Sequence, residues 1–156
     1  MKNSKILAIS LMAILVVGSS CKKDDVDNTP PAIVLGEPAN EDSLTIGEEV
    51  HFECDFSDDV ELKSYKVDIH FNDGHTHNKS AETFGEEGHP WTLEQSWDFE
   101  AGLKNSHIHH HEIVVPDSVV GELGVLEPVL RGEYHFGVYC TDVAGNESHV
   151  YIDVIL

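Results

Sequence analysis

Apolar side chains recur at every second residue in several short segments, and this alternation limits what the chain can fold into. Successive side chains of a β-strand point to opposite faces, so such a segment has one apolar and one polar face. Residues 49–56 show the pattern most clearly. Further strands are predicted at residues 31–35, 64–71, 92–99, 107–115, 134–140 and 150–156. Short alternating segments separated by frequent turns predict an all-β fold, an antiparallel β-sandwich.

The alternation also predicts which side chains form the core. The inward residues expected from it are Val50, Phe52, Cys54, Phe56, Tyr65, Val67, Ile69, Phe71, Leu93, Trp97, Phe99, Tyr134, Phe136, Val138, Cys140, Val150, Ile152, Val154 and Leu156. The stretch GEYHFGVYCTDVAGN, residues 132–146, resembles the penultimate strand and final turn of bacterial Ig-like domains. The resemblance implies an Ig-like Greek-key sandwich of about seven to nine strands over residues 32–156.

Residues 1–20 are predicted to be a signal peptide and not part of the fold. They combine a basic start, Lys2 and Lys5, with an apolar run over residues 6–17 and small residues before Cys21. The run is shorter than the roughly 20 residues that a membrane-spanning helix needs. A cysteine at this point resembles a bacterial lipobox, which implies cleavage before Cys21 and lipid attachment to its thiol. The alternative is an ordinary signal peptide in which Cys21 has no such role.

Residues 21–31 form a polar, proline-ended stretch that is predicted to be a flexible tether. Lysine followed by acids just after the cysteine resembles the surface-export signal of Bacteroidetes lipoproteins. The chain as a whole resembles surface lipoproteins of Bacteroidetes that carry a single histidine-rich Ig-like domain and have no assigned function. The resemblance implies an outer-membrane, lipid-anchored protein at the cell surface; the alternative is the periplasmic face.

The charge of the chain narrows its partners. The 156 residues carry a formal net charge of −20, and loss of the leader, with two lysines and no acids, makes it −22. Such a surface repels nucleic acid and anionic lipid head groups. We therefore expect no nucleic-acid partner and membrane contact only through acyl chains on Cys21. A membrane transporter or another surface protein is the expected protein partner.

Two cysteines remain besides Cys21, namely Cys54 and Cys140, both on the inward parity of their strands. In the Ig-like strand order they match the inter-sheet bridge position, so the resemblance implies a disulfide between them. The alternative is two buried free thiols, since free cysteine packs well in protein cores.

Histidines are the residues that suggest a chemistry. Eight of the eleven lie between His70 and His111. Residues two apart on a strand share a face, so His75 would lie beside His77, and His107, His109 and His111 would form one row. A pair from each segment supplies four imidazole nitrogens, the number that tetrahedral zinc needs. Copper(II) accepts similar donors. The predicted metal ligands are therefore His75, His77, His107, His109 and His111, with zinc or copper as the ion.

Several questions remain open at this point. The histidine row shares parity with Ile113 and Val115, so a regular strand would put it in the core unless a bulge intervenes. The alternative to metal binding is a metal-free accessory lipoprotein of an outer-membrane nutrient-uptake or adhesion assembly. Enzymatic activity is not expected, because no recognisable catalytic motif is present. Asp58, Asp59, Asp142 and Asn146 supply either calcium ligands or side chains that fix turns.

Overall fold

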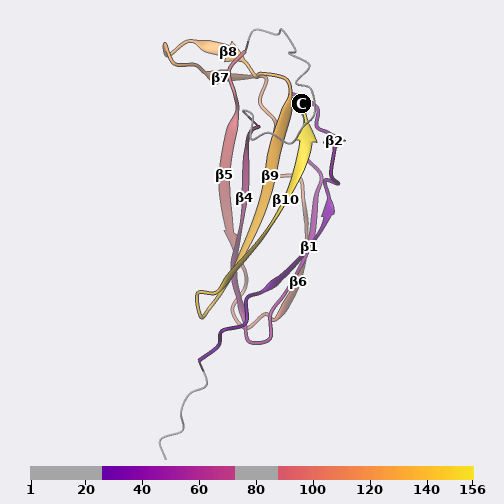
Figure 1. Ribbon diagram of the computed structural model, residues 1–156, viewed down its shortest axis with the longest axis vertical. Coiled ribbons are helices and arrows are strands. Elements are labelled where there is room, and N and C mark those ends of the chain that lie inside the picture. Colours follow the sequence, from indigo (N-terminus) through magenta and orange to yellow (C-terminus); the bar gives the residue numbers. More distant parts are fainter. Residues whose placement is uncertain (1–25, 73–87) are drawn as a thin grey trace, which may run out of the picture.

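The computed structural model describes residues 26–72 and 88–156, which fold into a sandwich of two β-sheets (Figure 1). The predicted signal peptide, the lipidation site Cys21 and the predicted ligands His75 and His77 lie outside the described residues. Within these two ranges no helix is long and apolar enough to cross a membrane. The predicted all-β sandwich is confirmed.

The first sheet has three antiparallel strands in the order β1-β3-β6. Their bounds are Ala32–Glu37 for β1, Phe52–Ser57 for β3 and Asn105–His110 for β6. The second sheet has the order β2-β10-β9-β4-β5. Its strands are β2 (Asp42–Ser43), β4 (Leu62–Phe71), β5 (Thr92–Asp98), β9 (Glu133–Asp142) and β10 (Glu147–Ile155). All neighbours in it are antiparallel except β2, which pairs with β10 in parallel.

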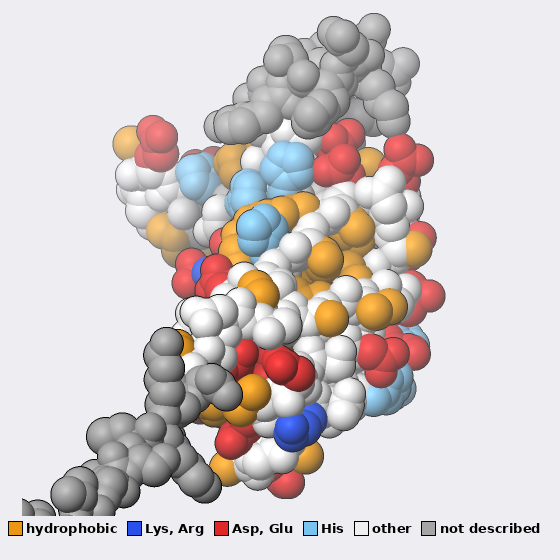
Figure 2. Space-filling view, turned by 60° about the horizontal axis from the view of Figure 1, so that its bottom comes forward, with side chains coloured by type: hydrophobic (Ala, Val, Ile, Leu, Met, Phe, Trp, Pro, Cys, Tyr) orange, Lys and Arg blue, Asp and Glu red, His pale blue; other side chains and the backbone are white. Residues whose placement is uncertain are grey.

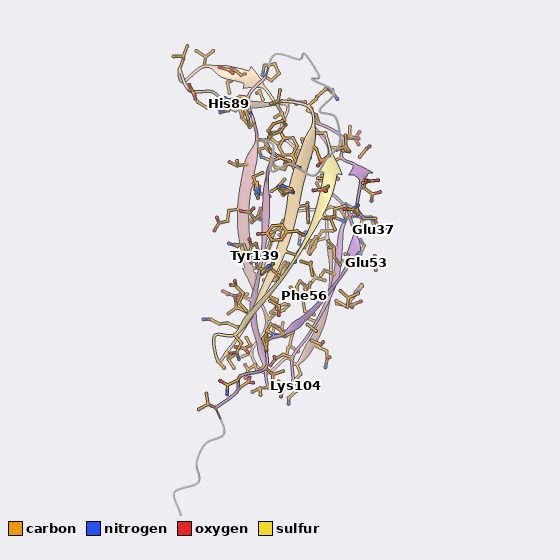
Figure 3. All side chains as sticks on the ribbon, in the orientation of Figure 1. Glu37, Glu53, Phe56, His89, Lys104 and Tyr139 are labelled. Atoms are coloured by element: carbon orange, nitrogen blue, oxygen red, sulfur yellow. The ribbon has the colours of Figure 1, made fainter. Side chains whose placement is uncertain are left out.

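The eight strands of the two sheets fall within the expected range, and a separate hairpin brings the total to ten. This hairpin consists of β7 (Ser118–Val120) and β8 (Leu126–Pro128). It projects at one end of the sandwich, whereas the N-terminal segment leaves at the other end (Figure 1). His89 lies beside the hairpin and Lys104 at the opposite end (Figure 3). The hairpin and the two-residue strand β2 were not predicted, because neither shows an apolar alternation.

The core forms where the inward faces of the two sheets meet. The side chains from β3, β4 and β9 that were predicted to face inward are buried there, except Phe71, which is partly buried. Phe52 illustrates the packing, because its ring is stacked on Phe136 of the other sheet at 6.3 Å between centroids. Five further side chains pack against the core edge and stay partly exposed, because they lie on β5 and β10, the strands that flank the pair β4-β9, or directly after β5. They are Leu93, Trp97, Phe99, Val150 and Ile152.

Candidate functional site

A one-residue bulge decides where the histidines of β6 point. Phe52 is the register partner of His110, whereas Glu49 bridges Val114, so three steps on one strand face four steps on the other. An extra residue of this kind resets the alternation of a strand. His107, His109 and His111 are therefore exposed, although Ile113 and Val115 further along the same segment are buried. The expected conflict of parity does not arise.

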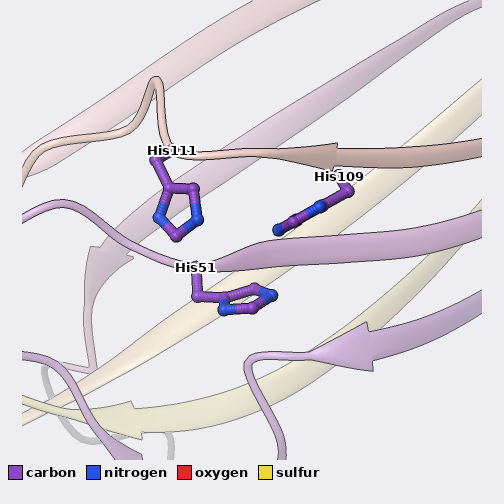
Figure 4. Close-up of side chains that lie close together, drawn as sticks. All are labelled: His51, His109 and His111. Carbon is purple, nitrogen blue, oxygen red and sulfur yellow. The ribbon is translucent and has the colours of Figure 1, made fainter.

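Three exposed histidines come together on the outer face of the first sheet. His109 lies on β6, His111 follows it directly, and His51 precedes β3, the neighbouring strand (Figure 4). Each offers a ring nitrogen, and these three nitrogens all lie within 4.8 Å of one another. We name this group the histidine triad. Figure 2 shows histidine side chains gathered next to one another on one face of the molecule.

The spacing of the three rings matches that of imidazoles sharing one metal ion. A nitrogen bound at about 2.0–2.1 Å puts its ring centroid about 3.2 Å from the metal, so two rings at a tetrahedral angle have centroids about 5 Å apart. The triad has centroid separations of 4.8 Å for His51–His109, 4.9 Å for His51–His111 and 5.5 Å for His109–His111. The separations of the three rings are therefore compatible with one shared metal ion.

Carboxylates lie next to the triad on the same face. Glu53 is the register partner of His109, and its Oε2 atom lies 3.8 Å from Nε2 of His51. Its other oxygen lies 4.0 Å from Nε2 of His107, whose Nδ1 bonds Asp55 at 2.9 Å. Glu53 also faces Glu37 on β1 (Figure 3). A carboxylate in this position is suited to be a fourth ligand and to balance the charge of a divalent cation.

Of the three predicted ligands that lie in the described part of the chain, the structure brings together two. His109 and His111 belong to the triad, whereas His107 lies on the same face but pairs with Asp55. His51 was interpreted as an ordinary strand residue, and this interpretation misses its place beside His109. The alternation does indicate that His51 points outward, because it lies between the inward residues Val50 and Phe52. What the sequence does not contain is the pairing of its strand with residues 105–110.

His110 points the other way, into the edge of the core. Its ring lies 4.9 Å from the rings of both Phe52 and Trp97. Its Nδ1 accepts a hydrogen bond from the Glu112 backbone, so its proton is assigned to Nε2, which is buried and has no hydrogen-bond partner among the described residues. Burial lowers the pKa of His110, and the nearby Glu112 carboxylate offsets part of this effect.

His110 should make the metal-free protein less stable in acid. The imidazole takes up a proton near pH 6.5 in the unfolded chain and at lower pH in the folded protein. The contribution of His110 to folding stability is therefore fully present above about pH 6.5 and decreases below it. We expect the urea concentration at the unfolding midpoint, measured with a chelator present, to decrease as the pH is lowered from about 7.5 to 5.5. His110→Phe should reduce that fall, and the exposed control His149→Phe should not. Equal falls in all three proteins would contradict this role.

Cys54 on β3 and Cys140 on β9 face each other's sheets and are both buried. They are free thiols in the structure, so the disulfide implied by the Ig-like resemblance stays a prediction. Burial raises the pKa of each thiol to about 12, and neighbouring negative charge adds to the effect. A thiol with such a pKa carries almost no thiolate near pH 8, and the thiolate is the reactive form.

The reduced, folded protein should therefore resist alkylation by iodoacetamide at about pH 8, and both thiols should react once urea unfolds it. Mass spectrometry of the peptides that contain Cys54 and Cys140 counts the added groups at these two residues, apart from any at Cys21. Rapid labelling of the folded protein would show that the thiols are accessible. The same count on unfolded protein that was never reduced tests the disulfide: two labels identify free thiols, and none identifies a bridge.

A group of acids lies at the end of the sandwich where the N-terminal segment joins it. Asp27, Asp58 and Asp142 bring carboxylate oxygens within 4.8 Å of one another. Much of their bonding capacity fixes turns: Asp58 Oδ1 accepts the backbone N–H groups of Val60 and Glu61, and Asp142 Oδ1 accepts those of Gly145 and Asn146. Burial opposes ionisation of Asp142, but the hydrogen bond from the Asn146 side chain and the backbone hydrogen bonds together prevail and lower its pKa. The hydrogen bonds support the turn interpretation of Asp58 and Asp142. Oδ2 of Asp27 and Oδ2 of Asp58 are buried without a hydrogen-bond partner among the described residues, so the calcium interpretation stays open; Asp59 is not part of the group.

The family model of a domain of unknown function (DUF4625) matches residues 19–156, which include both sheets and the histidine triad. No curated protein matches the chain.

Proposed function

The chain belongs to the DUF4625 family, a domain of unknown function, and we propose that it is a lipid-anchored extracytoplasmic protein that binds a transition metal, zinc or copper, through His51, His109 and His111. The observation that carries the proposal is the convergence of three imidazole nitrogens within 4.8 Å, from β6, the residue after it and the residue before its neighbour β3. Neutral imidazole is the commonest metal ligand, and three such ligands are typical of zinc sites that keep a further position open.

The surroundings of the triad favour exchangeable binding. All three histidines are exposed, so a metal there reaches solvent and ligands of another protein. Structural zinc sites are instead closed by four protein ligands. Glu53 supplies a carboxylate beside His51 that would complete the coordination or be displaced during transfer. The arrangement thus suits capture and release of a metal better than stabilisation of the fold.

The position of the triad also suits presentation to a partner. Asp58 and the N-terminal segment lie at one end of the sandwich, since Asp27 and Asp58 belong to the same acidic group. His51 and Asp58 lie at opposite ends of β3 and are seven residues apart, about 24 Å along an extended strand. An anchor on Cys21 would therefore hold the triad away from the membrane, where a membrane transporter or another surface protein can approach it.

Metal analysis of the untagged protein tests the proposal. We expect one equivalent of zinc to remain after gel filtration, and the triple variant His51→Ala, His109→Ala, His111→Ala to lose it. His89→Ala with His149→Ala is the matched control and should keep the zinc, because neither residue lies in the triad. No retained zinc or copper in the parent, or equal zinc in parent and triple variant, would refute the proposal.

A metal-free interaction module is the second candidate, and one feature favours it. The β7-β8 hairpin exposes Val120, Val125, Leu126 and, at 88 %, Leu123. Exposed apolar side chains that lie close together often mark a protein-binding surface. A partner that copurifies from outer membranes, survives chelation of metals and is lost when Leu123 and Leu126 are replaced by serine would favour this function.

A further inference from the structure

A second pair of histidines lies on the outer face of the other sheet. His70 on β4 and His135 on β9 are direct register partners, and their ring centroids are 5.3 Å apart. Both side chains point outward, because Ile69 and Phe136, their neighbours in sequence, are buried. Their separation is again close to the roughly 5 Å of two imidazoles on one metal ion.

Each of these imidazoles is held by a carboxylate. Nδ1 of His70 lies 2.6 Å from Oδ1 of Asp68, and Nδ1 of His135 lies 2.9 Å from Oδ1 of Asp153. Nδ1–H donates the hydrogen bond and the carboxylate accepts it, so in the neutral ring the lone pair is assigned to Nε2. This carboxylate–histidine arrangement is the one that commonly orients metal-binding imidazoles.

The two rings border a shallow hollow on this face of the sheet. His70, His135 and Tyr151 line this hollow, which is open to solvent and has a volume of about 260 Å³. Between them lies Gly137, the register partner of both Asp68 and Tyr151. A Cβ atom on Gly137 would lie 2.5 Å from the Tyr151 ring, so a larger residue would displace that ring. The Tyr151 hydroxyl is hydrogen-bonded to the Tyr139 hydroxyl, so the side of the Tyr151 ring forms a wall of the hollow.

From this geometry we infer a second metal site, in which Nε2 of His70 and Nε2 of His135 bind copper(II). Among divalent first-row metals copper(II) binds nitrogen ligands most strongly, and it accepts two imidazoles with water in its remaining positions. Zinc sites, in contrast, usually need at least three protein ligands, and the described residues supply only these two histidines around the hollow. The inference does not rest on the proposed function, since the triad lies on the other sheet.

Copper(II) titration followed by electron paramagnetic resonance tests this site. The starting protein is the triple triad variant, which removes His51, His109 and His111. We expect one copper equivalent with hyperfine structure from two nitrogens, lost when His70→Gln and His135→Gln are added. Asp68→Asn with Asp153→Asn should weaken copper binding roughly 10–100-fold, the usual effect of removing partners that orient ligands. His149→Gln is the matched control and should bind copper as its parent does.

Unchanged copper binding after both glutamine replacements would overturn the inference, and so would a signal without nitrogen coupling. Thermal unfolding checks that the glutamine variants fold. Gly137→Ala provides a second route, because it displaces the Tyr151 ring that lines the hollow and keeps both histidines. Zinc retention by His70→Gln with His135→Gln in the wild-type background reports on the triad alone. The two sites therefore succeed or fail separately.

Discussion

Replacing His51 alone with alanine should weaken zinc binding at least about 100-fold, beyond the usual effect of losing a residue that only orients a ligand. His51 supplies one of three nitrogens, and the two that remain, both from residues 109–111, cannot surround the ion. His107→Ala should change the affinity less than about fivefold, because its ring bonds Asp55 instead. Competition with a chromogenic chelator near pH 7.5 measures both constants.

This pair of variants separates the two possible ligand sets. His51→Asp should recover part of the affinity, since a carboxylate also ligates zinc, and this recovery distinguishes a lost ligand from a damaged strand. A large loss with His107→Ala together with normal binding by His51→Ala would instead support the row of His107, His109 and His111. In that case the triad would be a coincidence of packing.

Phe136→Ala should lower the free energy of unfolding by about 3–5 kcal/mol, the range for removing a buried aromatic side chain. Phe136 is fully buried in β9 and packs against Phe52 of the other sheet, so the cavity would open between the sheets. A domain of this size has a total stability of about 5–15 kcal/mol. The loss therefore approaches the whole stability of a marginal domain.

Tyr139→Ala is the matched control, because Tyr139 is an aromatic residue of the same strand that points outward. It contacts Tyr151 and the Lys66 ammonium group, which lies 4.4 Å from its ring centroid. We expect it to lose less than about 1.5 kcal/mol, as a partly exposed contact does. Urea unfolding followed by circular dichroism measures both. Similar losses in the two variants would mean that the core is not where the two sheets meet.

The strand predictions agree with the structure wherever a single segment shows its own apolar alternation. In β9, for instance, Tyr134, Phe136, Val138 and Cys140 alternate with polar or small residues, and all four are buried. Such a pattern needs no knowledge of the neighbouring strand, because a sheet with one buried face imposes the same alternation on each of its strands. The same reasoning placed His109 and His111 on a common face.

The ligand set could be predicted only in part, because it depends on which strands become neighbours. His51 and His109 are 58 positions apart in the chain. Nothing in either segment specifies the antiparallel register that pairs Glu53 with His109. The pairing of His70 with His135 was missed for the same reason. Such long-range partners follow from the packing of the whole sandwich, to which every core residue contributes.

The extra residue between His110 and Val114 acts like a frameshift within one strand. Upstream of it, odd-numbered positions carry imidazoles into solvent; downstream, odd-numbered positions carry Ile113 and Val115 into the core. Ligand positions and packing positions can therefore change independently over generations, although they share one short segment. Loss of a single residue there would put the histidines and the core residues Ile113 and Val115 on the same face. Either the histidines would then be buried or the two core residues would be exposed to water.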